Sequence, residues 1–142
     1  MRIRLKRVYD PAVRGDGVRI LVDRLWPRGL SKDSAALTEW MRDLAPSNEL
    51  RRWFHAHPVQ WPAFRKRYIE ELASPAASAA LERLHDIAAR RATVTLLFAS
   101  RDVEQNNAVV LKDLLEGERK PPTGTGPVRA VSSGRARAAR RG

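Results

Sequence analysis

Hydrophobic and charged positions alternate at the start of the chain. In residues 2–9 the apolar side chains fall on or near one face, with arginine and lysine between them, which predicts a half-exposed strand. The apolar positions over residues 18–23 are more continuous and predict a buried strand. Because the segment between them is too short for a crossover helix, we expect the two strands to be antiparallel neighbours that turn at Asp16 and Gly17.

Apolar residues recur at helical spacing in four segments of the middle of the chain. These segments are residues 31–44, 46–56, 62–72 and 76–91. Ser31 and Ser47 are candidate N-caps of the first two segments, and Pro62 suits the first turn of the third. The third segment is expected to carry one apolar stripe, made of Phe64, Tyr68, Ile69 and Leu72. The first segment fits a short helix followed by a loop equally well.

The clearest strand signal comes late in the chain. Residues 92–100, ATVTLLFAS, are apolar and β-branched, which predicts a buried strand. Helical spacing returns over residues 101–117 and ends at Gly117, a natural C-terminal cap. A strand, several helices, a strand and a helix imply a parallel pair joined by a right-handed crossover. The predicted fold class is α/β, a small sheet of about three strands, mixed parallel and antiparallel, packed with roughly four to five helices.

Charged residues directly follow two of the predicted strands. The segment DRLWPRG starts at Asp23 after one strand, and SRDVEQNN starts at Ser100 after the other. In open α/β sheets, ligands bind beyond the carboxyl ends of the parallel strands. We therefore expect a crevice lined by Asp23, Arg24 and Arg28 on one side and by Ser100, Arg101 and Asn106 on the other. Arginines and free N–H groups at the helix start near Asn106 favour an anion such as phosphate or carboxylate.

Each candidate also has a structural interpretation. Asp23 is the strongest candidate for a catalytic proton acceptor, but Asp23 and Arg28 fit equally well as a salt bridge that holds the loop. Trp26 fits either a ligand contact or packing beneath that loop. Ser47 is interpreted as a helix cap in preference to a nucleophile, because PSNE is typical of a helix start and no base accompanies it. Arg51 follows one turn later and reaches either the same pocket or solvent.

Several motifs together resemble a known family. The segments VYDP, LVDRLWPRGLSK, APS followed by ELR, and TLLFASRD, spread between about residues 3 and 116, are similar to the YeaO-like bacterial proteins, a domain of unknown function (DUF488). The resemblance implies a compact α/β domain and no established activity. The positions that it places in family motifs are Asp23, Arg24, Trp26, Pro27, Arg28, Gly29, Ser47, Arg51 and Asn106. The family often has a histidine where this chain has Asn107, so a catalytic histidine there is absent.

The composition excludes several classes of site. The chain has no cysteine, which removes disulfides, thiolate nucleophiles and cysteine-based metal sites. His55 and His57 are too close in sequence to share a helix face, and His85 belongs to a separate segment, so no metal site is expected. No phosphate-loop or dinucleotide signature is present, so no cofactor is expected. Without a long apolar run or a secretory start, a soluble cytoplasmic protein is expected.

The net charge of +11 is unevenly distributed. Residues 118–142 hold seven Lys or Arg against one Glu, a net of +6. This Pro-, Gly- and Ser-rich segment lacks hydrophobic periodicity, and we predict a disordered basic tail behind an α/β domain over residues 1–117. Such a tail either binds nucleic-acid backbones through counterion release or serves only for solubility.

Two functions remain open. In the first, which the crevice favours, the protein is a small enzyme or a ligand-binding protein that takes an anionic, nucleotide-like compound between the Asp23 and Ser100 segments. In the second, it is a non-enzymatic, nucleic-acid-associated protein that binds through residues 118–142. The sequence does not decide whether the protein is an enzyme, and it leaves the oligomeric state open. No membrane partner is expected.

Overall fold

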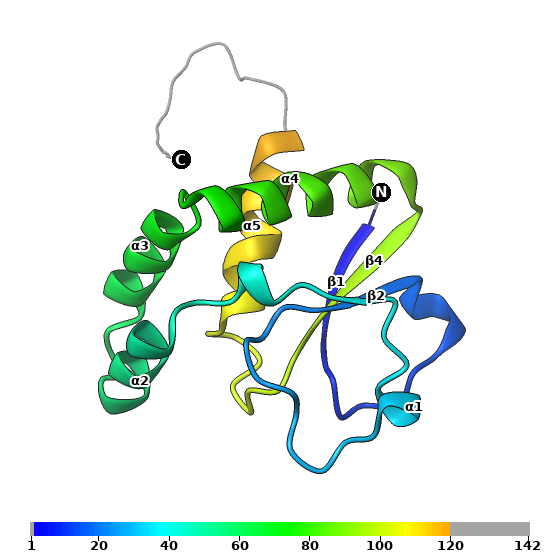
Figure 1. Cartoon of the computed structure of the whole chain (residues 1–142), viewed down its shortest axis with the longest axis horizontal. Coiled ribbons are helices and arrows are strands. Elements are labelled where there is room, and N and C mark those ends of the chain that lie inside the picture. Colours follow the sequence, from blue (N-terminus) through cyan, green and yellow to red (C-terminus); the bar gives the residue numbers. More distant parts are fainter. Residues whose placement is uncertain (1, 120–142) are drawn as a thin grey trace. The chain divides into compact units, whose positions relative to one another are not determined.

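A parallel sheet positions the candidate site. The computed structural model describes residues 2–119. The strands of this part are β1 (Arg2–Arg7), β2 (Val18–Leu21), β3 (Glu39–Trp40) and β4 (Thr93–Phe98), in the sheet order β1-β4-β2-β3. Every pairing is parallel, and β1, β2 and β4 lie side by side in Figure 1. The α/β class is confirmed, while the prediction of a mixed sheet of about three strands is wrong.

The first two strands are not the antiparallel neighbours that the sequence suggested. β4 lies between them and pairs with both in parallel. The connection over residues 8–17 returns beside β1, where Lys6 donates to the carbonyl of Pro11 and Arg4 to that of Gly15. An extended connection of this length spans roughly 30 Å, which is enough to run back along a short strand without a helix.

The helices follow the predicted segments, with differences at residues 31–44, at Ile69 and at the ends of the last helix. They are α1 (Lys32–Ala35), α2 (Asn48–Ala56), α3 (Trp61–Glu71), α4 (Pro75–Arg90) and α5 (Asn107–Arg119), with 3-10 turns η1 (Arg14–Asp16) and η2 (Arg42–Leu44). For residues 31–44 the short-helix alternative is right: Ser31 accepts from the Ser34 amide and caps α1, and the chain continues into the edge strand β3. Ile69 is 37% exposed and lies outside the stripe of α3, because one residue past Tyr68 turns it away.

The last described helix begins at Asn107, so the prediction that helix starts at residue 101 is wrong, since residues 101–106 form the loop after β4. It does not end at Gly117 either. α5 runs to Arg119, so the predicted cap is wrong and the glycine lies within the helix. Residues 2–112 belong to one compact unit, and the described part of the second unit, from Asp113 onward, is the end of α5. The predicted tail over residues 118–142 lies almost entirely outside the described residues, so the predicted domain boundary stays a prediction.

β4 is the centre of the core, as its continuous apolar sequence predicts. It is flanked by β1 and β2, and its side chains are buried from Val94 to Phe98, as expected for a central parallel strand. One buried cluster consists of Val8, Leu21, Ala35 and Leu97, and Trp26, Leu30, Leu37, Trp40 and Ala99 pack against it. This cluster anchors the segment that follows β2. None of the helices within residues 2–119 has the length and apolar character of a membrane span.

Candidate functional site

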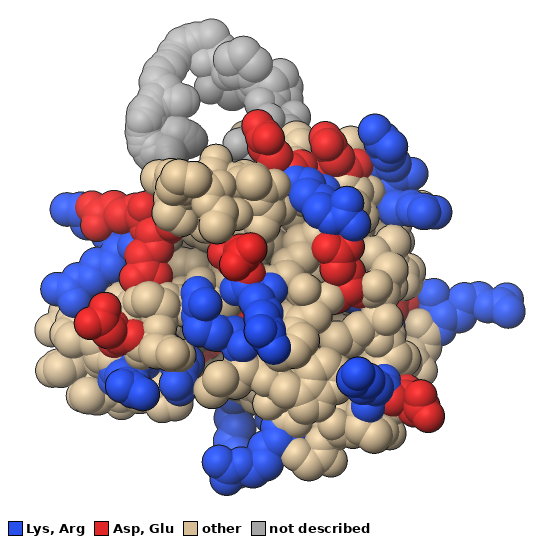
Figure 2. All heavy atoms as spheres, in the orientation of Figure 1, with Lys and Arg blue, Asp and Glu red and all other residues tan. Residues whose placement is uncertain are grey.

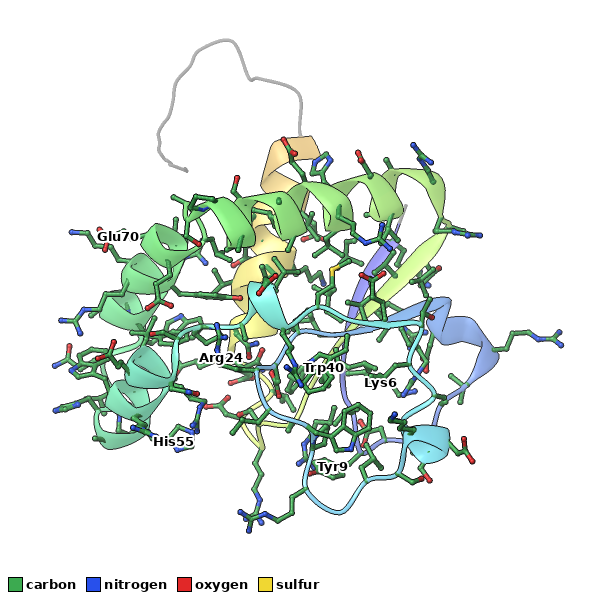
Figure 3. The ribbon with its side chains drawn as sticks, viewed as in Figure 1. Lys6, Tyr9, Arg24, Trp40, His55 and Glu70 are labelled. Carbon is green, nitrogen blue, oxygen red and sulfur yellow. The ribbon has the colours of Figure 1, made fainter. Side chains whose placement is uncertain are left out.

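A cavity of about 580 Å³ opens beyond the carboxyl ends of the strands. Its walls come from the segments that follow β1, β2 and β4 and from the α2–α3 pair. Tyr9, Arg24 and His55, which Figure 3 labels, line it from three of these segments. The volume is within the range of about 300–1,000 Å³ that is usual for small-molecule pockets. A crevice thus lies where the strand order leads one to expect it.

Most of the residues predicted for the site line this cavity. They are Asp23, Arg24, Trp26, Arg28, Arg51, Ser100 and Asn106. Ser47 and Arg101 are not part of the lining, and Arg101 is exposed. The parts that the lining residues play in binding or catalysis stay predictions.

Asp23 is half-buried and is the less exposed of the two acidic residues that line the cavity. Its Oδ2 accepts from the backbone N–H of Ala99 at 2.8 Å, and its Oδ1 accepts from the side-chain amide of Asn107 at 3.1 Å. Burial raises the pKa of the Asp23 carboxyl, and the two hydrogen bonds and the charge of Arg51 lower it by less, so the pKa lies above its ordinary value. The carboxyl therefore keeps a proton to a higher pH than an exposed aspartate does.

The predicted ion pair between Asp23 and Arg28 is absent from the described residues. Asp23 instead reaches Ala99, because β2 and β4 are neighbours and their ends lie side by side. Arg28 is exposed, and its backbone carbonyl accepts from the Tyr9 hydroxyl at 2.9 Å. The salt-bridge interpretation is therefore wrong, and the Arg28 guanidinium has no ion-pair partner within residues 2–119.

The two other arginines of the lining are held differently. Arg24 donates from Nε to the carbonyl of Pro46 at 3.2 Å and from Nη2 to that of Ala45 at 3.3 Å. Arg51 lies near the start of α2, and its Nε is buried without a hydrogen-bond partner in the part of the chain that the structure describes. A buried N–H that lacks an acceptor costs free energy. Arg51 also lines the cavity, so an acceptor that enters it can contact the Arg51 side chain.

Ser47 caps α2 and does not line the cavity. Its Oγ accepts from the N–H of Leu50 at 3.1 Å and donates to Oε2 of Glu71 at 2.6 Å. Its own N–H donates to Oε1 of Glu71 at 2.8 Å. The helix-cap interpretation is confirmed, and both polar groups of this serine serve to join α2 to α3.

The segment after β4 satisfies much of its own backbone. Asp102 accepts from the amides of Glu104 and Gln105, both at 2.9 Å. The Asn106 side chain accepts from the N–H of Val109 at 3.1 Å and donates to the carbonyl of Asp102 at 2.8 Å. Asn106 therefore caps α5, and the helix N–H groups that the sequence suggested for an anion are in part already occupied.

Sequence reasoning missed Asn107 and an aromatic wall. The Asn107 side chain joins the ends of two strands, since it donates to the carbonyl of Val22 and to Asp23; the only signal was its departure from the family's histidine. Phe54 and Phe64 both line the cavity, with stacked rings whose centroids are 4.5 Å apart. Their helical spacing indicated core, because a stripe of this kind looks the same whether it covers a core or one wall of a cavity.

Trp26 contributes to packing as well as to the lining. Its Nε1 donates to the carbonyl of Leu30 at 2.6 Å, and its ring meets Trp40 edge-on at 5.4 Å between centroids. Trp40 in turn donates to the carbonyl of Asp23 at 2.7 Å. These contacts support the packing interpretation of Trp26, and the residue also lines the cavity.

The charged side chains form no metal cluster in the part described and no single large patch on the face drawn in Figure 2. Over residues 2–119, no three or more His, Cys, Asp or Glu side chains gather as a metal site would require. On the face drawn in Figure 2, Lys and Arg are spread widely, with Asp and Glu among them.

Comparisons with known proteins place the chain in a family. The family model described as "Inactive DUF488-N3 subclade" matches residues 2–130. The uncharacterized protein YeaO of Escherichia coli is 49% identical over 115 residues, which are 81% of this chain and 97% of that protein. The uncharacterized proteins Mb3100c of Mycobacterium bovis and Rv3073c of Mycobacterium tuberculosis are each 44% identical over 116 residues, 82% of this chain and 95% of theirs. No solved structure matches. The chain therefore belongs to the YeaO-like DUF488 family, in the subclade described as inactive.

Proposed function

We propose that the cavity binds a small anion such as phosphate, with the guanidinium of Arg51 as its main contact. The observation that carries the proposal is the buried Arg51 Nε, which lacks an acceptor although Arg51 borders the cavity. An anionic oxygen that reaches the Arg51 guanidinium from the cavity accepts a charge-assisted hydrogen bond, which is about twice as strong as a neutral one. Binding thus satisfies a group that is otherwise buried at a cost.

The charge of the lining favours an anion over a cation. Arg24, Arg28 and Arg51 carry positive charge, and only Asp23 and Asp102 carry negative charge. Burial raises the pKa of Asp23, which weakens its opposition to an anion. Arg28 is exposed, so its long side chain is able to turn toward a bound ligand.

The proposed role is binding rather than catalysis. The subclade to which the chain belongs is described as inactive, and the candidate nucleophile Ser47 is occupied by its helix cap and by Glu71. Asp23 stays a candidate proton acceptor, because it lines the cavity and the pKa of its carboxyl is raised.

The substitution Arg51→Gln tests the proposal, with Arg52→Gln as a matched control. Arg52 is the next residue of α2, is exposed and does not line the cavity. Isothermal titration calorimetry with phosphate and with sulfate measures the affinity of each chain. We expect Arg51→Gln to weaken binding about tenfold or more, because a hydrogen bond to a charged group contributes roughly 1.5–3 kcal/mol. Equal affinities for the two variants, or a parent chain that binds neither ion, would reject the anion site.

The nucleic-acid function rests on residues 118–142, which lie almost entirely outside the described residues. It remains a prediction from composition. The basic side chains visible in Figure 2 have acidic ones among them, whereas a nucleic-acid surface has a continuous positive stripe. We therefore base the proposed function on the cavity and not on nucleic-acid binding.

A further inference from the structure

We infer that the ligand is a phosphate monoester that carries a flat ring, a class that includes nucleoside monophosphates and aryl phosphates. The phosphate lies at Arg51 and the ring lies against Phe54. The inference rests on the anion site proposed above, and it identifies the part of the ligand that an anion site alone does not require.

One face of α2 and of the turn after it carries both kinds of contact. Arg51, Phe54 and His55 line the cavity, and their spacing of three and four residues is that of one helix face, while Pro58 lines it from the turn after α2. With a rise of 1.5 Å per residue, Phe54 lies about 4.5 Å further along the helix axis than Arg51. A phosphate that is joined to a ring through a short linker spans this separation.

The apolar wall continues from α2 onto α3. The rings of Phe54 and Phe64 stack with their centroids 4.5 Å apart and their planes at 24°, and both residues line the cavity. Phe64 is buried, while Phe54 is only half-buried. Part of the Phe54 side chain is therefore left for a ligand. Aromatic side chains of this kind hold flat rings by stacking, with little dependence on which ring it is.

Two further segments bring rings to the lining. Tyr9 follows β1 and Trp26 follows β2. The Tyr9 hydroxyl donates to the carbonyl of Arg28, and the Trp26 Nε1 donates to that of Leu30. These bonds fix both rings at their polar atoms, so neither has to be ordered when a ligand binds. A bare inorganic anion makes no use of such a lining.

The size of the cavity also exceeds what an inorganic anion fills. A volume of about 580 Å³ holds on the order of twenty water molecules at about 30 Å³ each. An ion at Arg51 leaves most of that water in place against apolar side chains. A ligand with a ring displaces this water and gains the free energy of apolar burial.

Calorimetric titration of the full chain with four probes tests the inference. The probes are inorganic phosphate, ribose 5-phosphate, phenyl phosphate and adenosine monophosphate. We expect phenyl phosphate or adenosine monophosphate, the two probes with a flat aromatic ring, to bind about tenfold or more tightly than ribose 5-phosphate. A factor of this size is the effect of one stacked ring. Tighter binding of adenosine monophosphate selects the nucleotides, and tighter binding of phenyl phosphate selects the aryl phosphates.

The substitution Phe54→Leu removes the ring and keeps an apolar side chain. We expect it to abolish the advantage of the ring-bearing probes and to leave the affinity for inorganic phosphate unchanged. Trp53→Leu is the matched control, because Trp53 is the preceding residue of α2 and stacks on His57 instead of lining the cavity; this variant should bind like the parent.

The probe series on the parent chain decides the matter even where a variant fails to fold. If ribose 5-phosphate binds as tightly as phenyl phosphate and adenosine monophosphate do, the inference is overturned while the anion site stands. If none of the four probes binds, the anion site itself fails.

Discussion

The side-chain amide of Asn107 donates both to the carbonyl of Val22 at 2.8 Å and to Oδ1 of Asp23 at 3.1 Å. Asn107 begins α5, and the other two residues directly follow β2. One side chain thus joins the segments that leave two neighbouring strands. The hydrogen bond from Asn107 and the one from the Ala99 N–H together hold the carboxyl of Asp23 at the cavity.

We predict that Asn107→Ala lowers the free energy of unfolding by about 1–3 kcal/mol, because it removes the donor from two acceptors that are largely out of water. Urea denaturation measures the change. Asn48→Ala is the control: Asn48 is exposed in the first turn of α2, and surface substitutions of this kind stay within about 0.5 kcal/mol. Equal midpoints for the two variants would show that the Asn107 contacts contribute nothing.

We predict that anion binding weakens as pH rises. The pKa of Asp23 is raised above its ordinary value of 3.8, chiefly by burial. At pH values below the raised pKa the Asp23 carboxyl is neutral. As pH rises through that raised pKa, the carboxyl becomes an anion beside the proposed ligand. Its contribution to folding stability is lost over the same window, since the raised pKa means that folding favours the protonated form. Sulfate is the probe to titrate, because its own charge is constant in this range.

His55 is the control for this pH dependence, because its imidazole also lines the cavity. The variant His55→Gln should keep the pH dependence of sulfate affinity if Asp23 causes it. A flat profile in His55→Gln would assign the effect to the histidine.

A second aspartate has the opposite pH behaviour and gives a third prediction. Asp16 is fully buried and pairs with Lys6 and Arg19. Burial raises the pKa of the Asp16 carboxyl, but the Val13 amide and the two cations lower it by more, so the net pKa lies below its ordinary value. Its stabilising effect is present above the unfolded pKa and is lost as pH falls through the folded one.

We expect Asp16→Asn to lower the free energy of unfolding by about 3–5 kcal/mol at neutral pH, because it leaves the buried Arg19 and the half-buried Lys6 without their ion-pair partner. The exposed pair of Glu39 and Arg83, at 2.7 Å, is the comparison. Glu39→Gln should cost less than about 1 kcal/mol, since solvent screens exposed ion pairs. Guanidinium denaturation of the two variants checks the contrast, and similar losses would contradict it.

The order of strands explains what the sequence could and could not predict about the fold. The period of the apolar positions was enough for β1, β2 and β4, because alternation and continuous apolar runs reflect burial on one or two faces. It carried no information on which strands pair. β4 is distant in the sequence and inserts between β1 and β2, so the short connection that looked like a hairpin turn is a return path beside β1.

The candidate site shows the same division. Asp23, Arg24 and Arg28 could be placed at the cavity because charged residues after a parallel strand lie at the carboxyl edge of the sheet. The partner of Asp23 could not be predicted, because Ala99 contributes a backbone amide, which every residue type except proline carries. Phe54 could not be assigned to the wall because its spacing matches that of a core residue.

The last prediction concerns Gly17, which the sequence had suggested as half of a hairpin turn. Its φ is +63°, and a Cβ at this position would lie 2.3 Å from the carbonyl oxygen of Thr93, the first residue of β4. Gly17→Ala therefore combines the cost of a left-handed backbone with a clash against a strand that cannot easily move, and we expect a loss of roughly 3–5 kcal/mol. Gly29 separates the two causes, because its φ is +75° but no atom lies within 4 Å of its Cβ position. Gly29→Ala should cost only about 1–2 kcal/mol, and thermal denaturation followed by circular dichroism should show the larger fall in melting temperature for Gly17→Ala. Equal falls would mean that the close approach to β4 adds nothing, and that the backbone conformation alone requires glycine at this position.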